Sequence, residues 1–136
     1  MSHLLDTMVV SEASKTRPHS SVLAWFEAHR AADLRVSVVT VAEIWKGIAA
    51  RRRRDANGAD RLERWLVATL DEFAGKIVPI NERVARRWGE LVVATGHDGP
   101  DVMIAATALA HDLTLVTRNV RHFAGLGTRL ADPYEG

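Results

Sequence analysis

One stretch restricts the fold more than any other, residues 99–119, which read G-P-D-V-M-I-A-A-T-A-L-A-H-D-L-T-L-V-T-R-N. Pro100 suits the first turn of a helix, because its missing N–H would be unpaired there. The small apolar residues after Asp101 predict a buried helix, and residues 113–116 predict a short central strand. A helix that feeds a strand is half of a parallel α/β unit, whose chemistry gathers at the carboxyl ends of the strands. Asp101 and Asn119 are therefore expected to face one crevice.

The rest of the chain alternates predicted strands and helices. Short apolar or β-branched runs predict strands at residues 3–5, 35–39, 76–80, 113–116 and 128–130. Apolar residues at helical spacing predict helices that end near Lys15, that start after Ser20-Ser21, and that cover residues 44–54, 61–73, 82–95 and 102–110. This order predicts an α/β fold, a three-layer α/β/α sandwich around a mostly parallel sheet of four or five strands, as one domain over residues 1–136.

Local signals predict where the helices begin. Thr7 is expected to cap the first helix, Ser20-Ser21 the second, and Asn81 a later one. Thr40-Val41-Ala42-Glu43 matches a capping box, in which the threonine hydroxyl and the glutamate satisfy each other's backbone amides. Residues 55–60 contain Asn-Gly and predict the central turn of the chain.

Composition excludes several classes of protein. The chain has no cysteine, which rules out disulfides, thiolate zinc sites and cysteine nucleophiles. Its 18 Lys and Arg nearly balance 17 Asp and Glu, so net charge neither favours nor opposes a nucleic-acid partner. No apolar run approaches the length of a membrane span, and the N-terminus lacks the pattern of a signal peptide. The chain is expected to be a cytoplasmic protein without a membrane partner.

Three carboxylates stand at corresponding places in the predicted units. Asp6, Glu43 and Asp101 each lie just beyond a strand or in the first turn of a helix, so a parallel sheet would bring them together at one edge. A cluster of carboxylates needs a compensating cation and suits Mg²⁺ or Mn²⁺. Such an ion activates water and neutralises charge on a phosphate, which points to phosphodiester hydrolysis.

Each acid also has an ordinary structural explanation. Taken alone, Glu43 is better explained by the capping box. Asp101 could equally compensate the helix dipole, and Asp6 could end a strand as a turn residue. Their joint placement is what favours a metal site.

The chain also resembles a known family. Four segments look like the successive motifs of PIN-domain ribonucleases, specifically the VapC-type toxins, in order and spacing over residues 3–123: L-L-D-T from Leu4, T-V-A-E-I from Thr40, D-V-M-I-A-A-T-A from Asp101, and L-V-T-R-N from Leu115. The resemblance implies a metal-dependent endoribonuclease in which Asp6, Glu43 and Asp101 hold one or two Mg²⁺ or Mn²⁺ ions. It also implies an RNA substrate, a VapB-type antitoxin whose tail covers the active-site groove, and a toxin homodimer.

Two positions depart from the family pattern. Met8 stands where relatives usually have asparagine, which removes a polar group that would orient Asp6 or meet substrate. Asn119 and His122 stand where relatives often offer a fourth acid. Asn119 can still bond a metal-bound water, whereas a lone His122 beside Phe123 is more typical of a surface or packed residue than of a phosphate contact. These departures motivate an alternative, a catalytically weak or inactive PIN domain that serves as an antitoxin-binding and dimerisation module.

Several residues are candidates for contact with substrate or partner. Arg118 lies nearest the crevice by sequence, and it is expected, with Thr7, to contact substrate. The Arg51 to Arg54 run suits either a solvated helix face or contact with RNA or an acidic partner. Asp98 is a loop residue that could stand in as a ligand. The four tryptophans fall at apolar spacing and are expected mostly in the core.

Overall fold

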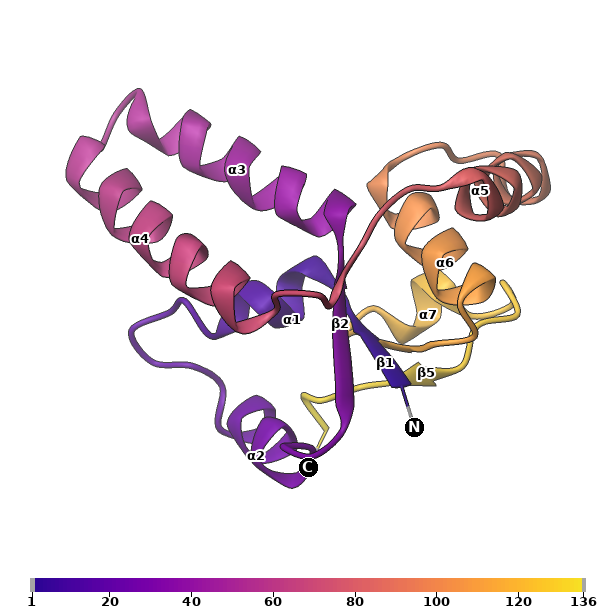
Figure 1. Cartoon of the computed structure of the whole chain (residues 1–136), viewed down its shortest axis with the longest axis horizontal. Helices are drawn as coiled ribbons and strands as arrows, with labels where there is room; N and C mark the ends of the chain where they lie inside the picture. Colours follow the sequence, from indigo (N-terminus) through magenta and orange to yellow (C-terminus); the bar gives the residue numbers. More distant parts are fainter. Residues whose placement is uncertain (1, 136) are drawn as a thin grey trace.

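A computed structural model of the chain describes residues 2–135, which form five strands and seven helices (Figure 1). The strands are β1 (Ser2–Leu5), β2 (Asp33–Ser37), β3 (Ile77–Val78), β4 (Thr114–Val116) and β5 (Leu130–Ala131). The helices are α1 (Thr7–Glu12), α2 (Ser20–Ala28), α3 (Val38–Arg52), α4 (Ala56–Glu72), α5 (Glu82–Thr95), α6 (Pro100–Ala110) and α7 (Val120–Phe123).

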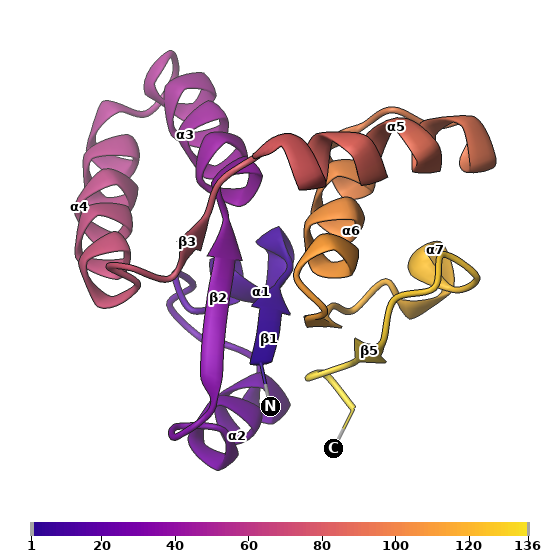
Figure 2. The same cartoon turned by 45° about the vertical axis from the view of Figure 1, so that its right-hand side comes forward.

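The sheet has the order β3-β2-β1-β4-β5, and every neighbouring pair is parallel. The predicted sheet of four or five mostly parallel strands is therefore confirmed in its five-stranded, all-parallel form. β1 is central, so His3 lies opposite Leu34 of β2 on one side and Thr114 of β4 on the other. In Figure 2, β1 and β2 run side by side toward the end of the sheet where α3 begins.

Helices cover both faces of the sheet, as the three-layer prediction requires. Leu4 and Leu115 pack into a core shared with α5 and α6. Their neighbours Leu5 and Val116 point to the opposite face, where Val9 of α1 and side chains of α2 and α4 cover them. This alternation follows from the two-residue period of a strand, which sends successive side chains to opposite faces.

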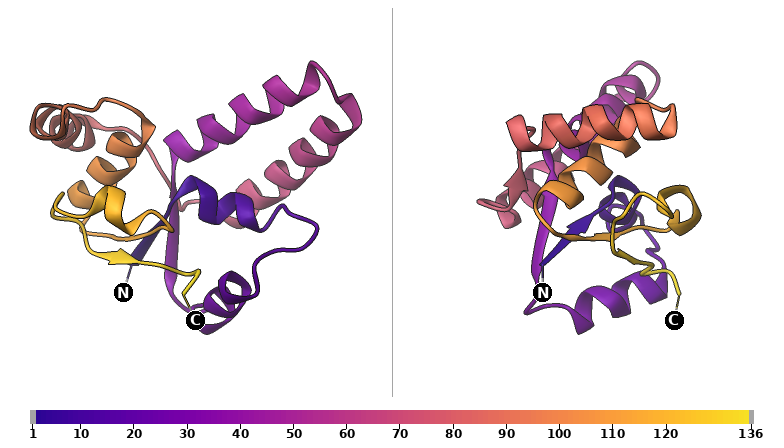
Figure 3. Two further views of the ribbon diagram at one scale, coloured as in Figure 1. Left: turned by 180° about the vertical axis from the view of Figure 1, so that it is seen from behind. Right: turned by 90° about the vertical axis from the view of Figure 1, so that its right-hand side faces the viewer.

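Helices α3 and α4 form a hairpin that projects from the sheet (Figure 1 and Figure 3). Its own small core is made by Ile48, Ala59 and Leu66. At its tip, Arg51 pairs with Asp55 at 3.1 Å, and Arg52 pairs with Asp60 and Glu63. Arg51 and Arg52 of the arginine run thus form ion pairs within the hairpin itself. Such pairs are typical of charged residues on a solvent-exposed helix face.

The predicted capping box at Thr40 is wrong. β2 ends at Ser37 and α3 begins at once with Val38, so Thr40 is buried inside the helix. Ser37 is the cap, because its hydroxyl accepts a hydrogen bond from the amide of Val39 at 3.0 Å. Val38 and Val39 are β-branched, as strand residues often are, so the sequence predicted that the strand continues to residue 39. In the structure the strand ends at Ser37.

The expected turn at residues 55–60 is also wrong, because α4 already begins at Ala56. Asp55 caps that helix by accepting from the amide of Gly58 at 2.9 Å. A Cβ at Gly58 would meet the ends of the Asp55 and Arg51 side chains, so a larger residue there would have to displace this ion pair.

The remaining boundaries shift by a few residues. Asp6 rather than Thr7 caps α1, His19 rather than Ser20-Ser21 caps α2, and the first helix ends at Glu12. The strand expected at residues 76–80 is shorter, because β3 covers only Ile77–Val78, and the strand expected at residues 128–130 overlaps β5 only at Leu130. The cap at Asn81 is confirmed, with its side chain accepting from the amide of Val84. In residues 2–135, none of the helices has the length and apolarity needed to cross a bilayer.

Candidate active site

Asp6 lies at the carboxyl end of the central strand and is buried, with an exposed fraction of 4%. One carboxylate oxygen accepts from the amide of Thr7 at 2.9 Å, and the other accepts from the hydroxyl of Thr117 at 2.8 Å. Burial raises the pKa of Asp6, and the nearby charges of Asp101 and Glu43 raise it further, although the two hydrogen bonds act in the opposite direction. Asp6 is therefore a desolvated carboxylate that is repelled electrostatically by Asp101 and Glu43.

Glu43 reaches the same place from the second turn of α3. Its Oε1 accepts from the hydroxyl of Thr7 at 2.7 Å, and the hydroxyls of Thr7 and Thr40 lie 2.9 Å apart. A hydroxyl has one proton, so Thr40 must donate to Thr7 when Thr7 donates to Glu43. This chain fixes the carboxylate of Glu43 beside the start of α1.

Asp101 occupies the first turn of α6, where the sequence predicted it. Its Oδ2 lies 3.2 Å from Nε2 of His122, and both side chains are 47% exposed. His122 was expected at the surface or packed, and it is indeed exposed, but it also contacts one of the three acids. A half-exposed pair of this kind contributes little to stability.

The segment after β4 forms the next wall of the site. Thr117 donates its hydroxyl proton to Asp6, and the same oxygen accepts from the amide of Asn119 at 3.0 Å. The amide group of Asn119 lies 3.9 Å from the sulfur of Met8, a weak acceptor. Asn119 therefore lies at the crevice beside Met8, which stands where the family pattern has asparagine.

The donor set suits a hard divalent cation. In residues 2–135, no three Asp, Glu or His side chains are gathered closely enough to enclose one ion as they stand. Mg²⁺ does not need such a cage, because it is commonly held by one or two carboxylates and keeps several waters. Asp6 has unused lone pairs on both oxygens, and a cation beside it would relieve the repulsion by Asp101 and Glu43.

Two predicted contacts lie at the rim. Arg118 is exposed, and its guanidinium stacks over the ring of Tyr134 with 4.5 Å to the ring centroid. Thr7 holds its hydroxyl between Thr40 and Glu43, so it is placed to position an acid as well as to meet substrate. Asp98 is exposed in the loop before α6.

Sequence reasoning missed three residues that shape this site. Thr117 follows a buried strand, and that position was a usable signal, because the end of a neighbouring strand meets the same edge. Thr40 looked like a cap, so its contact with Thr7 was hidden. Tyr134 lies in a short C-terminal segment without periodicity, and no local signal places it beside Arg118.

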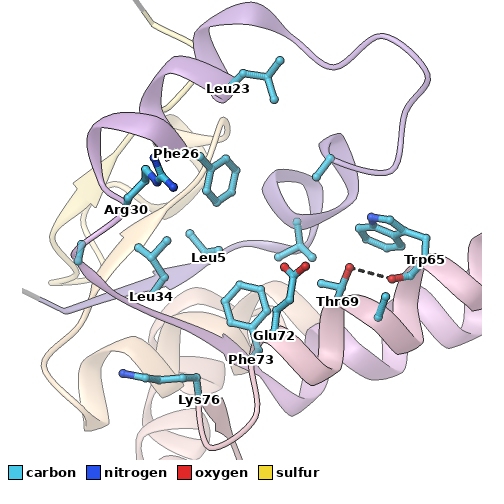
Figure 4. Close-up of a pocket in the computed structure, with 14 residues that line it drawn as sticks. Leu5, Leu23, Phe26, Arg30, Leu34, Trp65, Thr69, Glu72, Phe73 and Lys76 are labelled. Atoms are coloured by element: carbon cyan, nitrogen blue, oxygen red, sulfur yellow. Dashed lines mark hydrogen bonds between the residues drawn. The ribbon is translucent and has the colours of Figure 1, made fainter.

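A groove of about 720 Å³ lies between α2 and α4, and none of the three acids lines it (Figure 4). Leu23 and Phe26 of α2 line one wall, and Trp65 and Phe73 line the other. Most side chains that line the groove are apolar, and Arg30, Glu72 and Lys76 are its charged members.

Comparisons with known proteins agree with this geometry. The family model described as PIN domain matches residues 3–127. The chain is 34% identical to the VapC ribonuclease Y4jK of Sinorhizobium fredii (strain NBRC 101917 / NGR234) over 97% of each chain. It is also similar to the structure of FitAB bound to an IR36 DNA fragment (TM-score 0.84, 30% identity, 98% of this chain and 96% of that one). A toxin–antitoxin complex from Klebsiella pneumoniae gives a TM-score of 0.70 with 27% identity, over 99% of this chain and 100% of that one.

Proposed function

Because this chain belongs to the PIN-domain family, we propose that it is a metal-dependent endoribonuclease and the toxin of a toxin–antitoxin pair. The substrate would be cytoplasmic RNA, and the reaction would be hydrolysis of a phosphodiester bond. The observation that carries the proposal is the buried Asp6, which stands beside Asp101 and Glu43 at the carboxyl end of the central strand. A desolvated carboxylate with two acidic neighbours is costly unless a cation is bound, and such costs are typical of functional sites.

We assign the ligand roles to Asp6 and Asp101, with Glu43 completing the set. Mg²⁺ or Mn²⁺ held there would supply an acidified water and positive charge for the phosphate. The other residues orient these acids. The amide of Thr7 and the hydroxyl of Thr117 hold Asp6, and the hydroxyl of Thr7 holds Glu43. Asn119 lies close enough to this edge to bond a water or a phosphate oxygen.

The antitoxin partner follows from the same family. The similar Klebsiella pneumoniae structure is a toxin–antitoxin complex, and the chain aligns with it over nearly its whole length. We propose that an apolar segment of an antitoxin fills the groove between α2 and α4. Leu23 is 49% exposed on its wall, so Leu23→Asp should weaken antitoxin binding at least tenfold without changing the fold. Unchanged affinity in calorimetry would exclude this groove.

A homodimer is the second assembly that we propose. Val38 and Trp45 lie seven residues apart on α3, hence on one face, and are 39% and 37% exposed. Large apolar side chains exposed along one helix face are suited to a subunit interface. Sedimentation of the free chain should give a dimer, and Trp45→Glu should give a monomer. A wild-type monomer at micromolar concentration would contradict this assignment.

The test of the activity is cleavage of a pooled RNA substrate by antitoxin-free protein, with Mg²⁺, with Mn²⁺ and with EDTA. We expect cleavage with either metal and none with EDTA. Asp6→Ala should abolish cleavage. Glu72→Ala, which removes an exposed carboxylate outside the site, should retain it and is the matched control.

One observation favours a second function. Met8 is 47% exposed at the crevice, and its sulfur accepts a weak hydrogen bond from the side-chain amide of Asn119. The site therefore has fewer polar groups available for metal or substrate than the family pattern offers. A chain that binds the antitoxin and dimerises without cutting any RNA would be a binding module instead. In that case Met8→Asn is the variant to test for restored cleavage.

A further inference from the structure

Arg118 is held next to the acids by its neighbours in the chain. The amide of Thr117 donates to the carbonyl oxygen of Ala131 in β5 at 2.9 Å, and the hydroxyl of Thr117 donates to Asp6. The amide of Asn119 donates back to the hydroxyl of Thr117. Both residues that flank Arg118 are therefore fixed, and its Cα is about 3.8 Å along the chain from that of Thr117, a direct partner of Asp6.

The side chain of Arg118 is fixed as well, by an aromatic platform near the C-terminus. Its guanidinium stacks on Tyr134, whose hydroxyl donates to Oε1 of Glu12 at 2.9 Å. The ring of His19 packs edge-on against the same ring at 5.2 Å between centroids. Burial and the bond to Glu12 raise the pKa of Tyr134 to about 12, so the phenol keeps its proton at neutral pH. Glu12 itself is buried, which makes this support rigid.

The guanidinium has no acidic partner in the part of the chain that the structure describes. Within residues 2–135, Arg118 takes part in no ion pair, and its guanidinium makes no hydrogen bond to another side chain or to the backbone. It lines a hollow of about 600 Å³ together with Arg121 and His122. His122 contacts Asp101, so this hollow adjoins one of the three acids. The carboxylates of Asp132 and Glu135 also line it and would keep a phosphate on the side of the cations.

From this arrangement we propose that Arg118, held by Tyr134, forms a phosphate-binding subsite for an RNA nucleotide that enters the hollow between α7 and β5. The inference rests on the proposed nuclease function and adds a substrate contact and its positioning residue. A stacked guanidinium keeps its N–H groups free at the edge, where their planar fork matches two phosphate oxygens. Because Tyr134 orders the side chain before RNA arrives, binding avoids most of that entropy cost.

The experiment measures binding of a fluorescein-labelled single-stranded RNA of mixed sequence by anisotropy in EDTA, where no cleavage interferes. We expect Arg118→Ala to weaken binding about tenfold and to lower the salt slope by about 0.7, the contribution of one phosphate on a single strand. Tyr134→Leu, which removes the ring, should weaken binding about three- to tenfold. Tyr134→Phe keeps the stacking ring but loses the bond to Glu12, so its affinity should lie between that of Tyr134→Leu and that of the wild type.

A double-mutant cycle separates positioning from general destabilisation. Arg121 lies in the same hollow but does not stack on the ring, so Arg121→Ala is the matched control. The effects of Tyr134→Leu and Arg118→Ala should overlap, whereas those of Tyr134→Leu and Arg121→Ala should add. Additive effects in both pairs, or an Arg118→Ala variant with wild-type affinity and salt slope, would overturn the proposal.

A structural readout does not depend on RNA. The ring current of Tyr134 should displace the Nε–H resonance of Arg118 in the wild type and in Tyr134→Phe, and Tyr134→Leu should return it to the position of a solvated arginine. If the wild type binds and cleaves RNA while Arg118→Ala does the same, the subsite fails and the nuclease stands. If the wild type neither binds nor cleaves RNA, the proposed function itself fails.

Discussion

Replacing Glu12 by glutamine should destabilise the fold by about 2 kcal/mol. Glu12 is 4% exposed, and its carboxylate accepts from Lys15, from the amide of His19 at 3.0 Å and from Tyr134 at 2.9 Å. A glutamine can still accept from His19 and donate to Tyr134, so neither of these two partners is stranded, and the exposed Lys15 turns to water. The hydrogen bonds with His19 and Tyr134 lose the strengthening that the negative charge of the carboxylate gives them, about 1 kcal/mol each.

Lys15 adds little to this loss, because its side chain is 62% exposed. A loss of about 2 kcal/mol corresponds to a fall of about 7 °C in melting temperature for a domain of this size. Urea unfolding followed by circular dichroism measures the change directly. The matched control is Glu27→Gln, whose side chain is 72% exposed and pairs only with Arg30; its stability should stay within about 0.5 kcal/mol of wild type.

Acid should remove the difference between wild type and Glu12→Gln. Burial alone would raise the pKa of Glu12, but the hydrogen bonds from Lys15, His19 and Tyr134 outweigh it and hold the pKa below its ordinary value of 4.5. A carboxyl with a lowered pKa stabilises the fold above its unfolded-state pKa and loses that contribution as the pH falls through the folded-state pKa. The two stability curves should therefore run parallel near neutral pH and converge below pH 4.5. A constant gap down to pH 3, or no gap at pH 7, would refute the role given to these bonds.

Three further outcomes follow from the structure. Ser37→Ala removes the buried cap of α3 and should cost about 1 to 2 kcal/mol in urea unfolding, whereas the exposed Ser20→Ala should change little. Asp101→Asn should abolish cleavage, yet in EDTA its melting temperature should equal or exceed that of wild type, because repulsion of Asp6 is relieved; a clear fall would count against a metal site. Leu66→Ala opens the hairpin core and should cost about 2 to 5 kcal/mol, with faster amide exchange in α3 and α4 than in β1.

The sequence carried most of the architecture, because strands and helices differ in period and composition. The helix with Pro100 and Asp101 in its first turn and the following strand were predicted nearly as they stand. The predicted ends of strands and helices were wrong where the same residue type occurs in both kinds of element. Val38 and Val39 suit a strand by composition but form the first turn of α3, because Ser37 turns the chain there.

The sequence predicted the acids of the site, because their positions follow from the order of strands and helices, but it did not predict the contacts that hold them. Asp6 could be placed because it ends β1, and Asp101 because its helix leads into β4 and therefore begins at the opposite end of that unit, near the carboxyl ends of the strands. The contact of Arg118 with Tyr134 could not, because it joins two segments without regular periodicity. The contact of Thr117 with Asp6 spans 111 positions of the chain, and no local pattern encodes a pairing at that distance.

That long span has a consequence for how the protein is made. Of the five strands in residues 2–135, β1 is synthesised first, yet one of its two neighbours in the sheet is β4, and the hydroxyl that holds Asp6 comes from Thr117. A nascent chain that ends before these residues lacks a strand next to the centre of its sheet and has Asp6 without its lateral donor. Long-range pairings of this kind form late. If the chain is the nuclease we propose, its acidic site can be assembled only after the ribosome has passed Thr117, whose hydroxyl holds Asp6.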